Sequence, residues 1–207
     1  PRYSSSAASD VYKRQIPDYA LLQIVTPVFI RLLGVSNYNI KKFAGDSLRA
    51  KTFELCERLG KSLLSMGSTI TTAESCTGGG LASSITAIPG SSAWFELGFI
   101  TYSNSSKKKI LGIESALIDS HGAVSIEVVE AMASKSLAIA NADYAIAISG
   151  IAGPSGGTID KPVGTVCVAW AFHSNISSQT FKFPGNRDQV RSQAVEISLI
   201  QMLKYIN

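Results

Sequence analysis

The sequence predicts an α/β fold in which a single domain forms a three-layer sandwich around a mixed, largely buried sheet. First, segments with helical spacing of apolar residues alternate with short apolar or β-branched runs, as in folds where helices cover a sheet. Second, some of these runs are continuously apolar, which is typical of strands covered on both faces. The length of 207 residues and the hydrophobic content of 45% suit one domain with its own core.

The first half of the expected domain begins with an amphipathic helix at 48–66. Its leucines recur at near-helical spacing, and Gly67 supplies a residue that ends a helix well. A Pro-Gly pair at 89–90 stops a short second helix. The elements expected here are a strand at 69–73, a turn at 75–80, a short helix at 79–87 and an aromatic-rich strand at 94–102.

The second half opens with two short helices and closes with a long amphipathic one. Ser125 and the acidic residues after it predict a helix start, and the apolar run at 144–149 predicts a buried strand. The elements expected here are helices at 105–111, 115–120, 126–140 and 187–205, strands at 144–149, 163–171 and 177–183, and a Gly/Pro/Ser loop at 150–162. The last two strands form a hairpin in this prediction.

The first 47 residues lie outside this pattern. Residues 5–15 match the in-frame translation of a common transposase-based sequencing adapter, so we expect residues 1–15 not to be native protein. The alternative is a polar natural tail, which would also lie outside the fold. Residues 16–47 contain two prolines and no clear period, and this segment stays poorly defined. The expected domain therefore covers residues 48–207.

The position of the charged residues along the chain decides what the net positive charge means. A formal charge of +4 and a pI of about 9.0 suggest a nucleic acid or an anionic membrane surface. Residues 1–50 hold seven basic and three acidic residues, which accounts for the whole excess. The other 12 basic and 12 acidic residues balance, so we expect no nucleic-acid partner, although a local basic patch stays open.

The spacing of the cysteines and the length of the apolar segments indicate whether the protein binds zinc, forms disulfides or spans a membrane. Cys56, Cys76 and Cys167 form no CxxC or Cys/His spacing, which predicts no structural zinc and no disulfide framework. The longest apolar stretch near the N-terminus, 19–35, is interrupted by Gln23, Pro27 and Arg31, so no membrane association is expected. We expect a cytoplasmic protein without a metal centre.

Three clusters of small polar residues follow predicted strands. The first, Ala73-Glu74-Ser75-Cys76-Thr77-Gly78-Gly79, presents a serine hydroxyl where a strand ends and a helix begins. The N–H groups at such a helix start can hold an anion or an oxyanion. The alternative is structural, with Ser75 or Thr77 capping the helix and the glycines permitting close packing.

The second and third clusters offer further candidates for chemistry. The second, 101–107, combines a phenol, an amide, hydroxyls and an amine, and a lysine near a serine serves as its base if burial lowers the amine pKa. The alternative is a solvated basic run, because residues 107–109 are all lysine. The third, 149–157, is a glycine-rich loop able to wrap a phosphate or a ribose, or simply a long surface loop.

Five short motifs occur in this order along the chain: AESCTGG at 73–79, TYSNSSK at 101–107, GAVS at 122–125, SGIAGPSGG at 149–157 and PVGT at 162–165. In this combination the sequence resembles the CinA C-terminal domain family, the nicotinamide-nucleotide amidohydrolases also called PncC. The resemblance runs from about Leu48 to Tyr205 and includes the Phe183–Arg187 turn. Ser149 stands where this family usually has threonine, which keeps the hydroxyl.

This resemblance implies hydrolysis of the carboxamide of nicotinamide mononucleotide, giving nicotinic acid mononucleotide and ammonia in pyridine nucleotide salvage. It implies a serine nucleophile at Ser75 with assistance from Tyr102 and Lys107, no cofactor, and a homo-oligomer. The residues expected at the oxyanion and the substrate are Thr77, Gly78, Gly79, Asn104, Ser149, Gly150, Gly153, Gly156 and Gly157.

Some alternatives remain open at this point. Lys108 is a second candidate for the base. A non-catalytic nucleotide-binding or regulatory module, linked to competence or DNA damage, would share the glycine loops without needing a basic lysine. Full-length relatives often carry a molybdopterin-binding-like domain upstream, and about 47 residues precede the match here, so we expect a stand-alone form or a truncated reading frame.

Overall fold

The computed structural model describes residues 40–172 and 174–206, with side chains described from residue 50. By its contacts the chain divides into residues 1–44 and 45–207, and the second unit contains the whole sheet. The predicted adapter sequence lies outside the described residues, as does most of the 16–47 segment.

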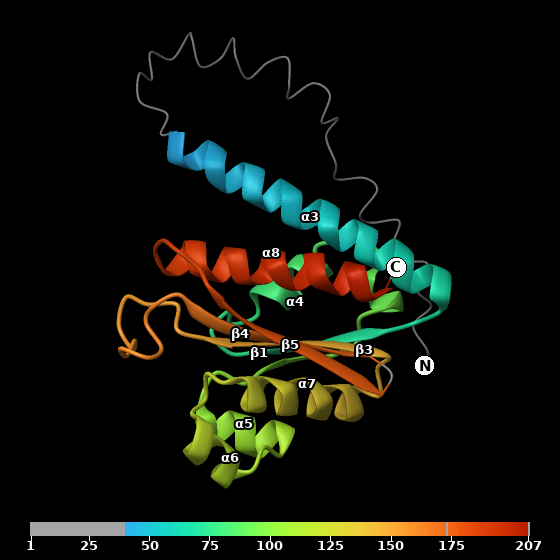
Figure 1. Cartoon of the computed structure of the whole chain (residues 1–207). Coiled ribbons are helices and arrows are strands. Elements are labelled where there is room, and N and C mark those ends of the chain that lie inside the picture. The colour runs from blue at the N-terminus through green and yellow to red at the C-terminus, as the bar shows by residue number, and fades with distance from the viewer. Residues whose placement is uncertain (1–39, 173, 207) are drawn as a thin grey trace, which may run out of the picture. The chain divides into compact units, whose positions relative to one another are not determined.

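Five strands form one mixed sheet in the order β2-β1-β3-β4-β5 (Figure 1). They are β1 Ile70–Glu74, β2 Gly98–Ile100, β3 Tyr144–Gly150, β4 Thr165–Phe172 and β5 Asn175–Lys182. Strands β2 and β3 pair in parallel with β1 on its two sides, whereas β4 and β5 continue the sheet in antiparallel fashion. The carboxyl ends of β1, β2 and β3 therefore meet at one edge of the sheet.

Helices cover both faces of this sheet (Figure 1). They are α3 Ile40–Met66, α4 Gly80–Thr86, α5 Asn104–Leu111, α6 Ser115–His121, α7 Ile126–Ala140 and α8 Arg187–Ile206. One core joins α4, α8 and residues 55–63 of α3 to the sheet, and it encloses both tryptophans. The other core joins α5, α6 and α7 to the opposite face. These layers confirm the predicted three-layer α/β sandwich.

Burial along the strands follows the expected pattern, with one exception. Strand β1 is buried at every position, and β3 and β4 are buried at all but their last residues. Strand β5 lies at the edge of the sheet and is exposed or half-buried throughout. The prediction of a largely buried sheet therefore holds for the strands that carry the site.

The predicted strand at 94–102 is wrong in extent. Only Gly98–Ile100 pairs with β1. Trp94 and Phe95 are buried in the first core, but they follow a short 3₁₀ helix at Ser91–Ala93. The Trp94 carbonyl accepts a hydrogen bond from the Ile70 N–H at 2.8 Å, before the strand begins. The apolar residues before Gly98 are thus buried although they lie in a loop. Sequence periodicity does not distinguish such a buried loop from a strand.

Candidate active site

Residues from all three polar clusters line one cavity at the carboxyl ends of the parallel strands. Ser75 follows β1 directly, Tyr102 and Lys107 follow β2, and Ser149 and Gly150 end β3. The cavity has a volume of about 270 Å³. The connection after β1 leads to β2 on one side and the connection after β3 leads to β4 on the other, and the point between two such strands is a common place for ligands.

The side chains of Ser75 and Lys107 contact one another in this cavity. Lys107 Nζ lies 3.0 Å from Ser75 Oγ, although the two residues are 32 positions apart. Ser75 is 7% exposed and Lys107 only 1%. Lys108 and Lys109 are exposed, so the geometry favours Lys107 over its neighbours as a partner for the serine.

Helix α5 directs Lys107 inward. Ser103 caps the helix, and its side chain and that of Ser106 exchange hydrogen bonds with each other's backbone N–H groups, both at 3.0 Å. This capping box fixes where the helix begins. Lys107 then lies on the buried face with Leu111, one turn further on.

Burial lowers the pKa of Lys107 below its ordinary value of 10.5, because desolvation disfavours the charged ammonium. No carboxylate among the described residues forms an ion pair with it. Its remaining contacts are neutral, at 2.9 Å to the Thr101 carbonyl and 3.4 Å to the Tyr102 carbonyl. The site therefore holds an amine that gives up its proton more easily than an exposed lysine does.

The three partners of Lys107 Nζ are all hydrogen-bond acceptors. A neutral lysine has two N–H donors and one lone pair, whereas the ammonium has three donors and no acceptor. Lys107 Nζ donates to Ser75 Oγ and to the carbonyls of Thr101 and Tyr102, and the Ser75 hydroxyl donates to the Tyr102 carbonyl. Once the amine has lost a proton, its lone pair can turn to Ser75 Oγ and accept the hydroxyl proton, which is the arrangement that activates a hydroxyl nucleophile.

The turn that carries Ser75 is held by a buried carboxylate. Glu74 accepts hydrogen bonds from the N–H groups of Gly79, Leu81 and Ala82. The Ser75 N–H donates to the Ile148 carbonyl of β3 at 2.9 Å. Sequence reasoning placed Glu74 beside the turn without deciding its role.

The cavity brings together most of the predicted site residues. Those that line it are Ser75, Tyr102, Asn104, Lys107, Ser149, Gly150, Gly153 and Gly156. The Ser149 hydroxyl donates to the Ala123 carbonyl at 2.6 Å, which ties the glycine-rich loop to the 122–125 motif.

Thr77, Gly78, Gly79 and Gly157 do not line this cavity. The Gly78 N–H donates to the Ser75 carbonyl at 3.0 Å, and the Gly79 N–H donates to Glu74, so neither is free for a ligand. The Thr77 N–H has no acceptor among the described residues. Thr77 instead lines a second, larger cavity.

Sequence reasoning missed Arg187 as a site residue. Its guanidinium lies at the cavity, donating to the Gly153 carbonyl at 2.9 Å and to the Tyr102 phenol at 3.1 Å. A usable signal existed, because a domain with no net charge needs a local cation to hold a phosphate. Arg187 is the first residue of α8 and the last residue of the 183–187 turn.

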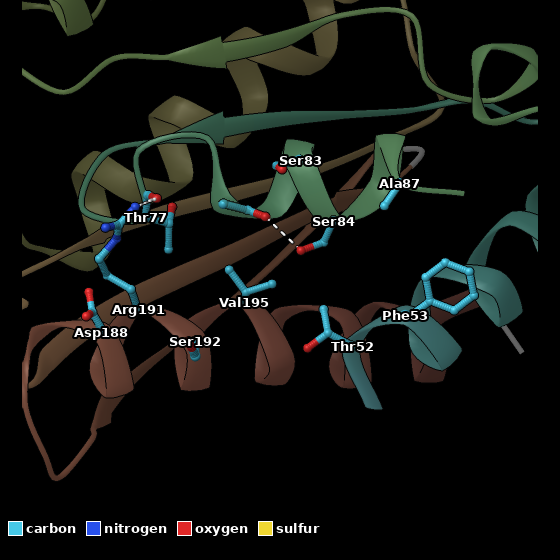
Figure 2. Close-up of a pocket in the computed structure, with 11 residues that line it drawn as sticks. Thr52, Phe53, Thr77, Ser83, Ser84, Ala87, Asp188, Arg191, Ser192 and Val195 are labelled. Atoms are coloured by element: carbon cyan, nitrogen blue, oxygen red, sulfur yellow. Dashed lines mark hydrogen bonds between the residues drawn. The ribbon is translucent and has the colours of Figure 1, made fainter. Parts of the chain in front are cut away.

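A larger cavity of about 800 Å³ lies between α3, α4 and α8 and contains neither Ser75 nor Lys107 (Figure 2). Of the turn that carries Ser75, the larger cavity is lined by Thr77 and Gly80. The Thr77 carbonyl accepts a hydrogen bond from Arg191 at 2.7 Å. We assign the chemistry to the smaller cavity, because the nucleophile and the amine lie there. Between residues 50 and 206, the described side chains include no group of three or more His, Cys, Asp or Glu that could hold a metal ion.

Comparison with known proteins identifies the family of this fold and site. The family model described as the CinA C-terminal domain matches residues 52–206. The chain belongs to this family. Solved structures of the CinA superfamily have the same fold: a competence or damage-inducible protein from Enterobacter asburiae matches with a TM-score of 0.73 and 36% identity, covering 75% of this chain and 98% of that one.

Named relatives within the CinA family share about half of their residues with this chain. The protein named nicotinamide-nucleotide amidohydrolase PncC from Pseudomonas putida is 50% identical over 150 residues, covering 72% of this chain and 94% of that protein. The protein of the same name from Escherichia coli K12 is 50% identical over 151 residues, covering 72% and 92%. No helix within the described ranges is long and apolar enough to cross a membrane.

The lowered pKa of Lys107 predicts a dependence of stability on pH. The unfolded chain binds this proton more tightly than the native protein, so the contribution of Lys107 to the free energy of unfolding rises with pH until about 10.5, where the unfolded amine also deprotonates. Urea unfolding of the wild type and of Lys107→Met across this range should show a free-energy difference that grows with pH. Lys109→Met, an exposed change in the same helix, corrects for the lost charge. A difference that stays constant would mean that burial does not perturb Lys107.

Proposed function

We propose that this protein hydrolyses the carboxamide of nicotinamide mononucleotide to nicotinic acid mononucleotide and ammonia, with Ser75 as nucleophile and Lys107 as base. The observation that carries the proposal is the 3.0 Å contact between Ser75 Oγ and a buried, uncompensated lysine amine. The names of the relatives from Pseudomonas putida and Escherichia coli support the substrate.

In the first half of the reaction, Ser75 Oγ attacks the carboxamide carbon while Lys107 takes the hydroxyl proton. The oxyanion that forms needs hydrogen-bond donors, and we assign this role to the backbone N–H of Cys76, the residue after Ser75 that lines the cavity. A donor of this kind is worth about 3 kcal/mol in transition-state stabilisation. The Lys107 ammonium then gives its proton to the carboxamide nitrogen as the C–N bond breaks, and ammonia leaves.

In the second half, water releases the acyl group. Lys107, neutral again, takes a proton from the water as its oxygen attacks the ester carbon of the acyl-serine. The proton returns to Ser75 Oγ when the ester bond breaks, which frees the nucleotide acid and restores the starting enzyme. Lys107 supplies every proton transfer in this scheme.

Tyr102 is better suited to holding the substrate than to moving a proton. Its phenol contacts Arg187, while only its backbone carbonyl lies near Ser75 Oγ, at 3.4 Å. Arg187 offers a guanidinium at the cavity wall beside the glycine-rich loop. We assign the substrate phosphate to this arginine, because a planar guanidinium suits bidentate contact with phosphate oxygens.

Cys76 lines the same cavity but is a poor nucleophile. Burial raises the pKa of its thiol to about 12, so the thiol keeps its proton near neutral pH. Lys107 Nζ is hydrogen-bonded to the serine hydroxyl and to two carbonyls. The nucleophile is therefore Ser75 and not its neighbour.

Ser75→Ala tests the reaction directly. We expect ammonia release from nicotinamide mononucleotide to fall by roughly 10⁴-fold or more, because the covalent route is lost. Ser105→Ala, an exposed serine on α5, serves as the control and should retain wild-type turnover. Undiminished turnover in Ser75→Ala would exclude the serine mechanism. A wild type that is stabilised by the nucleotide but releases no ammonia would instead support a binding module.

Arg187→Met tests the assignment of the phosphate. Hydrogen bonds between Arg187 and the phosphate would contribute about 1.5–3 kcal/mol to binding. Their loss should raise the KM for nicotinamide mononucleotide by roughly 10- to 100-fold with little change in kcat. Nicotinamide riboside, which lacks the phosphate, is the matched control substrate. Wild type and variant should handle the riboside equally poorly. An equal penalty on both substrates would show that Arg187 acts only through the loop or Tyr102.

A further inference from the structure

The turn that carries Ser75 has little intrinsic rigidity. Gly78 and Gly79 adopt positive φ values of 58° and 90°, a conformation that glycine reaches easily and leaves easily. Ser75 Oγ nevertheless has to stay within hydrogen-bond distance of Lys107 Nζ. Two backbone hydrogen bonds lie within the turn, from the Gly78 N–H to the Ser75 carbonyl and from the Gly80 N–H to the Thr77 carbonyl, and contacts from outside the turn add to them.

Glu74 supplies a restraint from the sheet side. The residue is 0% exposed, and its carboxylate accepts the Gly79 and Leu81 N–H groups at 3.0 Å and the Ala82 N–H at 2.8 Å. These three bonds join the last residue of β1 to the far end of the turn and the first turn of α4. Hydrogen bonds to an ionised carboxylate are about twice as strong as neutral ones.

Arg191 supplies a restraint from α8. Its Nη2 donates to the Thr77 carbonyl at 2.7 Å, in the middle of the turn (Figure 2). Neither Glu74 nor Arg191 lines the cavity that contains Ser75 and Lys107. Any effect that these residues have on the reaction must pass through the turn.

We propose that Glu74 and Arg191 are positioning residues that clamp the 75–80 turn from opposite sides and so hold Ser75 Oγ at Lys107. The inference rests on the proposed function, since it takes Ser75 as the nucleophile. Substrate binding depends on Arg187 and the 149–157 loop, which this clamp does not include. Loosening the clamp therefore lowers kcat and leaves KM nearly unchanged.

The test uses two variants that loosen the clamp at different points. Glu74→Gln keeps the shape but replaces one acceptor oxygen with an amide that cannot accept an N–H. Arg191→Met removes the bond to Thr77 at a residue that is only half-buried. The matched controls are Glu130→Gln, a half-buried carboxylate on α7 bonded to Ser178, and Arg58→Met, an exposed charge on α3.

Each variant is assayed for folding, steady-state kinetics with nicotinamide mononucleotide, and the rate at which a fluorophosphonate modifies Ser75. We expect kcat and the rate of modification to fall together, by roughly 10- to 100-fold, in both clamp variants. The KM should stay close to that of the wild type, and both control variants should resemble the wild type. If Glu74→Gln fails to fold, the result for Arg191→Met decides.

A folded clamp variant with wild-type kcat and wild-type modification of Ser75 would overturn the positioning role. A loss that appears in KM alone would also overturn it, because the effect would then lie in substrate binding. Ser75→Ala separates a failure of the proposed nucleophile from a failure of the proposed clamp. Full activity in Ser75→Ala removes the nucleophile and this proposal with it, whereas an inactive Ser75→Ala with active clamp variants removes only the clamp.

Discussion

The site depends on a primary amine that is held out of water without a carboxylate partner. Removing an ammonium from water costs several kcal/mol unless an opposite charge compensates for it, so burial lowers the pKa of this amine. Among the described residues, Lys107 Nζ forms hydrogen bonds with two carbonyl oxygens and the Ser75 hydroxyl. The same burial that penalises the charged lysine is what would let it act as a base toward this hydroxyl in the proposed mechanism.

The sheet topology brings the two groups together. Parallel pairing of β2 and β3 with β1 places the residues that follow these strands at one edge, and the 3.0 Å contact spans 32 positions of sequence. The turn after β1 supplies the serine, and the capped start of α5 supplies the lysine. The loop after β3 and the start of α8 add groups suited to a nucleotide phosphate. The antiparallel strands β4 and β5 complete the cover of the core without contributing to the cavity.

Sequence analysis predicted the layers and placed the clusters at strand ends, because alternation and continuous apolar runs reflect burial directly. It also named Ser75 and Lys107, through the motifs. It could not show that Lys107 is buried while Lys108 is exposed, since that difference depends on where the α5 cap begins the helix. It overextended the strand before Tyr102, because Trp94 and Phe95 are buried from a loop. It did not assign Arg187 or Arg191 to the site, because the partners of these arginines lie 34 and 114 positions away.

The pKa of the Lys107 amine decides whether this residue can act as the base, and it can be measured without substrate. An NMR titration of protein labelled in its lysine side chains follows each Cε and Nζ resonance with pH, and the signals absent from Lys107→Met identify this residue. We expect a titration midpoint for Lys107 below 10.5, with the neutral form gained as pH rises through that midpoint. A midpoint at or above 10.5 would mean that the amine stays charged, and Lys107 would then not be the base that activates Ser75.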